Sequence, residues 1–183
     1  MSKLVSISSP FTVRSPVGFD QPIEMLKECH RRVHDQCDTL HRLVGYLYAH
    51  GSDQSSAQAA SAIVRYFDVA GPKHHADEEE DLIPALYESV AGSDALCLKG
   101  MADALHGQHE SLNQQWHAMR LVLKQIVENK CTELDEVAVN SLVDGYRAHI
   151  HFEETEIYPM AERLLTEDAI AKMGFSMRLR RNL

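Results

Sequence analysis

The sequence predicts an all-α fold, an antiparallel up-down four-helix bundle with an irregular N-terminal arm and a short C-terminal helix. Apolar residues and histidines recur at alternating spacings of three and four along four long segments, the pattern of helices packed along one face. The connections between these segments are short, which favours antiparallel neighbours. No segment alternates between apolar and polar residues as a half-buried strand does.

The composition describes an ordinary globular chain: 183 residues, 44% hydrophobic and 25% charged. We divide it into an irregular arm (1–19), a bundle domain (20–165) and a short amphipathic C-terminal helix and tail (166–183). The net charge of −9 argues against nucleic acid as a partner. No apolar stretch could span a bilayer or serve as a signal peptide, and the four cysteines form no CxxC pair. The sequence therefore predicts a cytoplasmic protein with no membrane partner.

The first helix is predicted from about residue 20 to residue 49. Asp20 is a candidate N-cap, and Pro22 suits the first turn. The predicted buried stripe consists of Leu26, His30, His34, Cys37, His41, Val44 and Tyr48.

The second helix is predicted from about Ser55 to Ser89. Pro72 interrupts it, because proline removes a backbone donor and its ring crowds the preceding turn. We therefore expect either a kink or a new helix at Pro72.

The third and fourth helices have the clearest stripes. The third begins near Ser93 and ends near Glu128, and Thr132 is a candidate cap for the fourth. The stripe of the third helix is Met101, Leu105, His109, Leu112, Trp116, Met119, Leu123 and Ile126. The stripe of the fourth is Val139, Leu142, Tyr146, His149, Glu153, Ile157, Met160 and Leu164.

The chain contains an internal repeat. The segments HHADEEEDLIP (74–84) and HIHFEETEIYP (149–159) both fit H-x-x-x-E-E-x-x-[LI]-[IY]-P and lie 75 residues apart. The same offset places His34 on His109. Each half is thus a helix with one stripe histidine, followed by a His-x-x-x-Glu helix. The repeat predicts two similar helix pairs related by an approximate two-fold axis.

Six side chains are predicted to meet at the bundle axis: His34, His74, Glu78, His109, His149 and Glu153. Burying unpaired carboxylates is costly, and cations would offset that cost. Imidazole and carboxylate suit Fe, Mn, Zn and Cu, and the absence of cysteine from the set disfavours a thiolate site. Two bridging glutamates and four histidines would give each of two ions two nitrogen ligands. The sequence therefore predicts a dinuclear centre, with a single ion left open.

Two other metal motifs are absent. The chain has no Glu-x-x-His pair of the ferritin-like kind, and the zinc-protease motif HExxH fails at Asn113. The acidic run 77–81 is predicted to be mostly a solvated face. The sequence leaves open whether His30, or His75 with Glu79, also contacts the metal.

These motifs resemble the hemerythrin-like, or HHE cation-binding, domain over about residues 20–165. The resemblance implies a non-haem di-iron centre in which Glu78, Glu153 and an oxo or hydroxo group bridge the two ions. The four predicted histidines would supply the nitrogens, and Zn or Mn would fit the same donors. Members of this family bind O2 reversibly, sense oxygen or iron, or respond to NO and oxidative damage, including repair of iron–sulfur clusters.

Oxygen-carrying hemerythrins use a fifth histidine from a His-x-x-x-His pair on the third helix, where this chain has Leu105 and Asn113 on either side of His109. The set therefore looks like the four-His, two-Glu type of the cluster-repair proteins, whose separate N-terminal cysteine-bearing domain is expected to be absent here. Our leading hypothesis is a di-iron protein that binds or responds to O2, NO or related oxidants.

Two alternatives stay open. The first is a di-iron enzyme with peroxidase-like, ferroxidase-like or cluster-repair activity, since the sequence does not decide whether the protein turns over. The second is a metal-dependent sensor or interaction module that contacts a protein partner or a second copy of the chain. Its contact surfaces would be the arm and the basic residues Arg178, Arg180 and Arg181.

Overall fold

Four antiparallel rods form the bundle in the computed structural model, which describes residues 17–183 and confirms the predicted fold class. Residues 1–16 of the predicted arm lie outside the described residues. The rods are α1 (Pro22–His50); α2 (Gln54–Ala76) continued by the π-helix η1 (Asp77–Leu82) and α3 (Ile83–Ser89); α4 (Ser93–Val127); and α5 (Glu136–Phe152) continued by the π-helix η2 (Glu153–Ile157) and α6 (Tyr158–Leu164). The short C-terminal helix α7 (Glu167–Arg180) follows.

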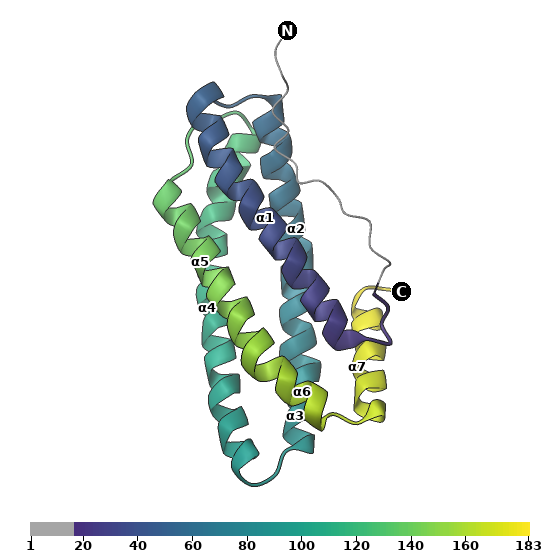
Figure 1. The fold of residues 1–183 in the computed structure, drawn as a ribbon. Coiled ribbons are helices and arrows are strands. Elements are labelled where there is room, and N and C mark those ends of the chain that lie inside the picture. Colours follow the sequence, from purple (N-terminus) through teal and green to yellow (C-terminus); the bar gives the residue numbers. More distant parts are fainter. Residues whose placement is uncertain (1–16) are drawn as a thin grey trace.

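Each rod has two neighbours. Helices α1 and α4 both pack against α2 and α5, so the rods close into a ring around one axis. Figure 1 shows α7 outside this ring, beside the beginning of α1. Within residues 17–183, no helix has the length and apolar character needed to cross a membrane.

The predicted stripes of the third and fourth helices are confirmed, because nearly all of their members are buried on α4 and along α5, η2 and α6. The stripe predicted for the first helix is confirmed at Leu26, His30 and Cys37 and is wrong at two of its other positions. His34 and Tyr48 are exposed, and the buried side chains there are Val33, Leu40 and Leu47. Each of these aliphatic residues precedes a predicted stripe residue by one position. Burying an aliphatic side chain is more favourable than burying a histidine or tyrosine, so α1 turns that face inward.

Three predicted helix boundaries also change. Helix α2 runs through Pro72 to Ala76, so of the two outcomes expected there, the start of a new helix is wrong. Helix α5 begins after Asp135 rather than near Thr132, because the Asp135 carboxylate accepts a hydrogen bond from the Val137 N–H (2.9 Å). The residue that precedes α1 is Gln21, not Asp20.

Two π-helical turns interrupt corresponding places in the two halves of the bundle. The N–H of Ile83 donates to the carbonyl of Glu78, five residues earlier, and Tyr158 donates to Glu153 in the same way. A proline follows each donor directly. In an α-helix its ring would collide with the carbonyl four residues earlier, and the wider turn moves that carbonyl aside. Such turns are frequent at functional sites, and here both begin at a predicted metal-ligand glutamate or one residue before it.

The interior consists of two apolar clusters with a polar layer between them. One cluster contains Val33, Leu40, Phe67, Trp116 and Leu142, among others. The other contains Leu26, Leu86, Leu105, Ile157 and Met173, among others. The buried residues of the polar layer are His30, His74, His75, Asp77, Glu78, His109, His149 and Glu153. The layer is therefore shielded from water at both ends by close-packed apolar side chains.

Helix α7 is held by arginines that bind the acidic run. Asp77 is fully buried, and its carboxylate accepts hydrogen bonds from Arg180 and Arg181. Arg180 also binds Asp81 (2.7 Å), and Arg178 lies over the ring of Phe19. The prediction that residues 77–81 are mostly a solvated face is therefore wrong for Asp77, because a buried carboxylate needs cations and the tail supplies them.

We predict that Gly174→Ala destabilises the docking of α7. A Cβ built on Gly174 would collide with the carbonyl oxygen of Phe19, because α7 lies directly against that backbone. We expect the free energy of unfolding, measured by urea denaturation, to fall by about 1–3 kcal/mol. Gly45→Ala is the control, because its Cβ meets nothing within 4 Å and should add about 0.5–1 kcal/mol. A gain in both variants would contradict this account of α7.

Candidate metal centre

The structure brings together five of the six predicted site residues: His74, Glu78, His109, His149 and Glu153. All five are buried, and the two glutamates have no exposed surface. The sixth, His34, does not join them, because it lies on the exposed face of α1. The histidine that α1 directs into the site is His30, which is 1% exposed.

The position of His30 follows from the face that α1 buries. His30 precedes Val33 by three residues, so both lie on the inner face of the helix. His34 was favoured by the internal repeat, which aligns it with His109. The first helix departs from that repeat by one turn. The heptad Leu26, Val33, Leu40 was the sequence signal that could have identified His30.

The first group of donors consists of His30, His74, Glu78 and Glu153, whose ligand atoms all lie within 4.8 Å of one another. The Nε2 atoms of His30 and His74 face each other at 3.1 Å. His30 Nε2 lies 3.0 Å from Glu153 Oε2, and His74 Nε2 lies 3.6 Å from Glu78 Oε1. Two imidazole nitrogens and two carboxylate oxygens thus converge on one point.

The second group consists of Glu78, His109, His149 and Glu153. His109 Nε2 lies 3.4 Å from Glu78 Oε2, and His149 Nε2 lies 3.0 Å from Glu153 Oε1. Each glutamate therefore directs one oxygen to each group. Cations held by the two groups would share both carboxylates, and each cation would have two imidazole nitrogens.

The donor atoms have the unsatisfied valences that cations would complete. Within residues 17–183, the buried side-chain atoms without a hydrogen-bond partner are His74 Nδ1, Glu78 Oε2, His109 Nε2, His149 Nε2 and both carboxylate oxygens of Glu153. All of them belong to this site. Each such atom costs about 1–3 kcal/mol when left unpaired. Metal ions fit the site because they accept the lone pairs of all of these atoms except His74 Nδ1, whose ring directs Nε2 to the site, and because they neutralise the two carboxylates.

The charges of the site shift the ionisation of its members. Burial raises the pKa of Glu153, yet its contacts with His109 and His149 outweigh burial and hold that pKa well below its ordinary value. Burial lowers the pKa of His109, but its contacts with Glu153 and Glu78 raise it to about 10. Burial lowers the pKa of His74. Without metal, the site therefore balances its carboxylates with protons on histidine.

Of the four histidines in the two donor groups, three make a hydrogen bond through Nδ1, the ring nitrogen that points away from the site. These contacts join His30 to Glu154 (2.8 Å), His109 to Glu79 (2.5 Å) and His149 to Gln108 (3.0 Å). Because carboxylate and amide oxygens accept, each Nδ1–H donates, and in the neutral ring Nε2 has a lone pair directed inward that a metal ion can bind. Glu79, which the sequence left open as a metal contact together with His75, instead reaches across to His109 on α4.

Tyr158 is a site residue that the sequence did not identify. Its buried hydroxyl donates to Glu78 Oε1 (2.7 Å) and lies 3.2 Å from His30 Nε2. Its ring stacks on that of His30. Burial, followed by the charges of Glu78 and Glu153, raises the pKa of Tyr158 well above its ordinary value. The phenol therefore stays protonated and fixes the orientation of the Glu78 carboxylate.

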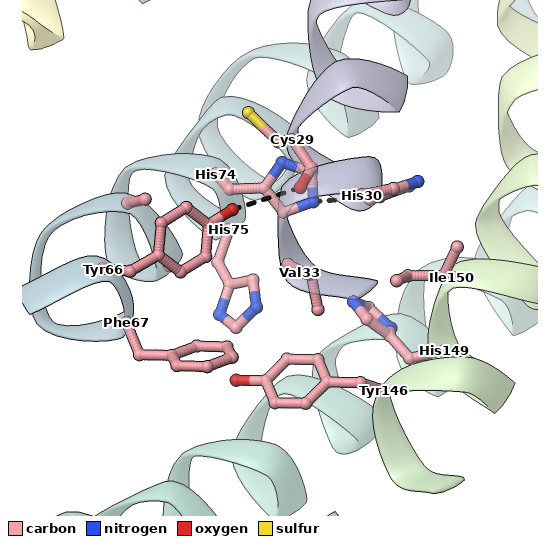
Figure 2. Close-up of a pocket in the computed structure, with 12 residues that line it drawn as sticks. Cys29, His30, Val33, Tyr66, Phe67, His74, His75, Tyr146, His149 and Ile150 are labelled. Carbon is pink, nitrogen blue, oxygen red and sulfur yellow. Dashed lines mark hydrogen bonds between the residues drawn. The ribbon is translucent and has the colours of Figure 1, made fainter. Parts of the chain in front are cut away.

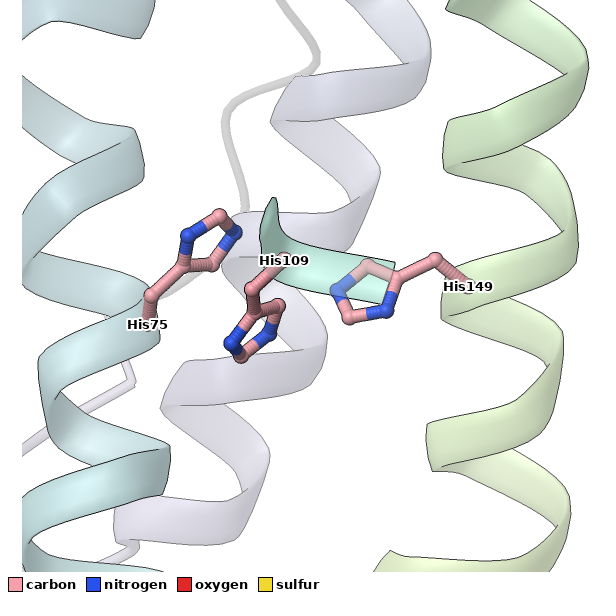
Figure 3. A group of neighbouring side chains, drawn as sticks. All are labelled: His75, His109 and His149. Atoms are coloured by element: carbon pink, nitrogen blue, oxygen red, sulfur yellow. The ribbon is translucent and has the colours of Figure 1, made fainter. Parts of the chain in front are cut away.

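His75 lies at the edge of the site. Figure 3 shows His75 and His149 projecting toward His109 from α2 and α5. The rings of His75 and His109 stack face to face, with centroids 3.8 Å apart and planes 12° apart. An imidazole lone pair lies in the plane of its ring, and one ion cannot lie in both parallel planes. In this arrangement His75 packs against a ligand ring and does not join it at the same ion.

A cavity of about 20 Å³ adjoins the histidines. Figure 2 shows Phe67, Tyr146 and His75 gathered around it. Its other lining residues include Val33 and Ile150 on the apolar side and His30, His74 and His149 on the side of the site. This volume accommodates a molecule about the size of water.

We predict that His30→Ala and His34→Ala have different effects on bound metal. His30→Ala removes a donor from the first group, so the metal content should fall from about two ions to about one per chain, with a lower melting temperature. His34→Ala should keep both ions, because its side chain is exposed. Elemental analysis of the two variants provides the measurement. Metal loss in His34→Ala alone would reverse the assignment.

We also predict that metal uptake releases protons. His109, with a pKa of about 10, holds a proton at neutral pH that a metal ion must displace. Calorimetry in buffers of different ionisation enthalpy should show release of about one proton per chain or more, with apparent affinity rising about tenfold per pH unit for each proton. A constant affinity between about pH 6 and about pH 9 would contradict this prediction.

In the metal-free protein, the same shift links stability to pH. Because the folded-state pKa of His109 lies above its ordinary value of 6.5, its contribution to stability is complete below pH 6.5 and is lost as the pH rises through about 10.

Comparison with known proteins identifies the family. Residues 21–161 match the family described as the hemerythrin HHE cation binding domain. The chain is also similar to an uncharacterised protein of Haemophilus influenzae, with 32% identity over 165 residues that cover 90% of this chain and 92% of that protein. The matched range contains every donor of both groups. The chain therefore belongs to the hemerythrin HHE cation-binding family and is a metal-binding hemerythrin-like protein.

Proposed function

We propose that the protein holds two iron ions in the buried site and binds O2 or NO there. The observation that carries this proposal is that two groups of donors share both glutamates, whereas the third candidate group, His75 with His109 and His149, contains no carboxylate. A single ion would leave half of the buried donors unsatisfied, whereas two ions use all of them. The ligands would be His30, His74, His109 and His149, with Glu78 and Glu153 as bridges.

The donor chemistry supports iron without excluding other ions. Mixed imidazole and carboxylate sites suit Fe and Mn as well as Zn. When bound, a pair of iron ions would supply one-electron redox chemistry and open coordination positions for a small molecule. The protein's own contribution is to hold the donors in a dry layer and to fix one bridging carboxylate through Tyr158.

The cavity supports a small, uncharged ligand. It is lined by Val33, Phe67 and Ile150 on one side, which offer no group to solvate an anion. His75 also lines it, and its pKa is lowered to about 2, first by burial and then by His109, so this ring adds no positive charge. A small, uncharged molecule such as O2 or NO is therefore favoured over an anion or a larger substrate.

The sensor or interaction alternative receives less support. Its proposed contact surface included Arg180 and Arg181, and both are paired with carboxylates of η1 within the chain. The remaining alternative is a di-iron enzyme, and turnover distinguishes it from a binding protein.

We predict that protein purified without oxygen contains about two iron ions per chain and gains a new absorption band on exposure to O2 or NO. Reversal of the band when the gas is removed would support binding. Many turnovers with peroxide or Fe(II) per chain would instead establish an enzyme. Protein that takes up no metal under these conditions would remove the proposal.

A cavity variant tests where the gas enters. Ala70 lines the cavity, so Ala70→Leu should reduce gas affinity about tenfold or more while the metal content stays the same. Ala62→Leu is the matched control, because Ala62 lies on the same helix and does not line the cavity. Equal affinities in the two variants would exclude this cavity as the binding site.

A further inference from the structure

The second glutamate of each Glu-Glu pair is not used by the proposed function. Glu78 and Glu153 enter the site, whereas Glu79 and Glu154 lie at its rim with side chains 36% and 42% exposed. The two rim glutamates are 75 residues apart, so they occupy equivalent places in the internal repeat. Each reaches across the bundle to a histidine on another rod.

The rim contacts determine the direction of two ligand rings. Glu154 accepts from His30 Nδ1 (2.8 Å), and Glu79 accepts from His109 Nδ1 (2.5 Å). The opposite nitrogens, Nε2, then face the bridging carboxylates. A carboxylate behind a ligand histidine fixes its tautomer and increases its basicity, and losing such a partner typically costs about 10–100-fold in metal affinity.

The other two histidines are held less firmly and unequally. His149 Nδ1 donates to the Gln108 amide oxygen (3.0 Å), which is uncharged. His74 Nδ1 is buried and has no hydrogen-bond partner among the described residues. The position between His109 and His149 therefore has two anchored rings, whereas the position between His30 and His74 has one.

Resting on the proposed two-ion site, we propose that Glu79 and Glu154 are positioning residues, each serving one metal position, and that the two positions retain their ions unequally. The ion between His30 and His74 leaves first, because only Glu154 anchors its nitrogen ligands. The ligands of the two positions are thus similar, but the hydrogen-bond partners of their Nδ1 atoms differ.

The test uses the full chain loaded with Zn²⁺, which is redox-inert, and follows the release of zinc to excess chelator. Wild-type protein should release its zinc in two phases of similar amplitude. Glu154→Leu should accelerate the fast phase by about 10–100-fold, and Glu79→Leu should accelerate the slow phase. Glu154→Gln should have a smaller effect than Glu154→Leu, because an amide oxygen still accepts, as Gln108 does for His149.

Glu156→Leu is the matched control, since Glu156 lies on the same π-helix, is exposed and makes no ion pair or hydrogen bond among the described residues. The melting temperatures of the metal-free variants show whether a substitution destabilises the fold itself. They should be similar for Glu154→Leu and Glu156→Leu. Nitrogen-15 NMR of the zinc protein should show faster solvent exchange of the His30 Nδ1 proton in Glu154→Leu alone.

The outcomes separate this inference from the function on which it rests. Zinc release in a single phase, or release from Glu154→Leu at the rate of Glu156→Leu, would overturn the inference while leaving the two-ion site intact. A wild-type chain that binds no zinc and no iron would remove both.

Discussion

Two fully buried carboxylates, Glu78 and Glu153, are the constraint on which the rest of the structure depends. The cost of removing charge from water reaches several kcal/mol for each ion, and an apolar bundle offers nothing to offset it. The fold meets this cost by placing four imidazoles at the same level, one from each rod. Metal ions would add to what the histidines and Tyr158 supply, because Glu78 Oε2 and both Glu153 oxygens lack a hydrogen-bond partner among the described residues.

Asp77 and Glu78 are adjacent buried carboxylates whose charges are balanced in two different ways. Asp77 and Glu78 are both buried, yet they face different partners. Asp77 is neutralised by Arg180 and Arg181, which arrive from α7 outside the bundle. Glu78 is directed to the axis, where the histidines and Tyr158 surround it. Helix α7 therefore stabilises the π-helical turn that directs Glu78 to the axis, and its arginines support the site from outside the bundle.

The two apolar clusters and the two π-helical turns together define the polar layer. The clusters exclude water from both ends, which strengthens every charge interaction between them. Each π-helical turn adds one residue at the level of the glutamates, η1 in the rod of α2 and α3 and η2 in the rod of α5 and α6. Function-related geometry is thus concentrated where the helices depart from regularity, as in many proteins.

The amino-acid sequence by itself determined the four rods, the site on the second and fourth of them, and the histidine of the third. The spacing of His74 with Glu78 and of His149 with Glu153 places each pair on one helix face, and the repeat makes the two pairs equivalent. These are local properties, because helical periodicity depends only on residues a few positions apart. The family resemblance rested on the same local motifs.

The tertiary structure decided between two competing sequence signals for the histidine of α1, the heptad for His30 and the internal repeat for His34, and it alone showed which residues contact the Nδ1 atoms of the site histidines. His30 and His34 are one turn apart, and the choice between them depends on whether Val33 and Leu40 face the core, which is settled when all four rods pack. The contacts of Glu154 with His30, Glu79 with His109 and Arg180 with Asp77 each span about 30 residues or more of sequence. No helical periodicity reports such contacts, because they arise from the docking of one rod against another.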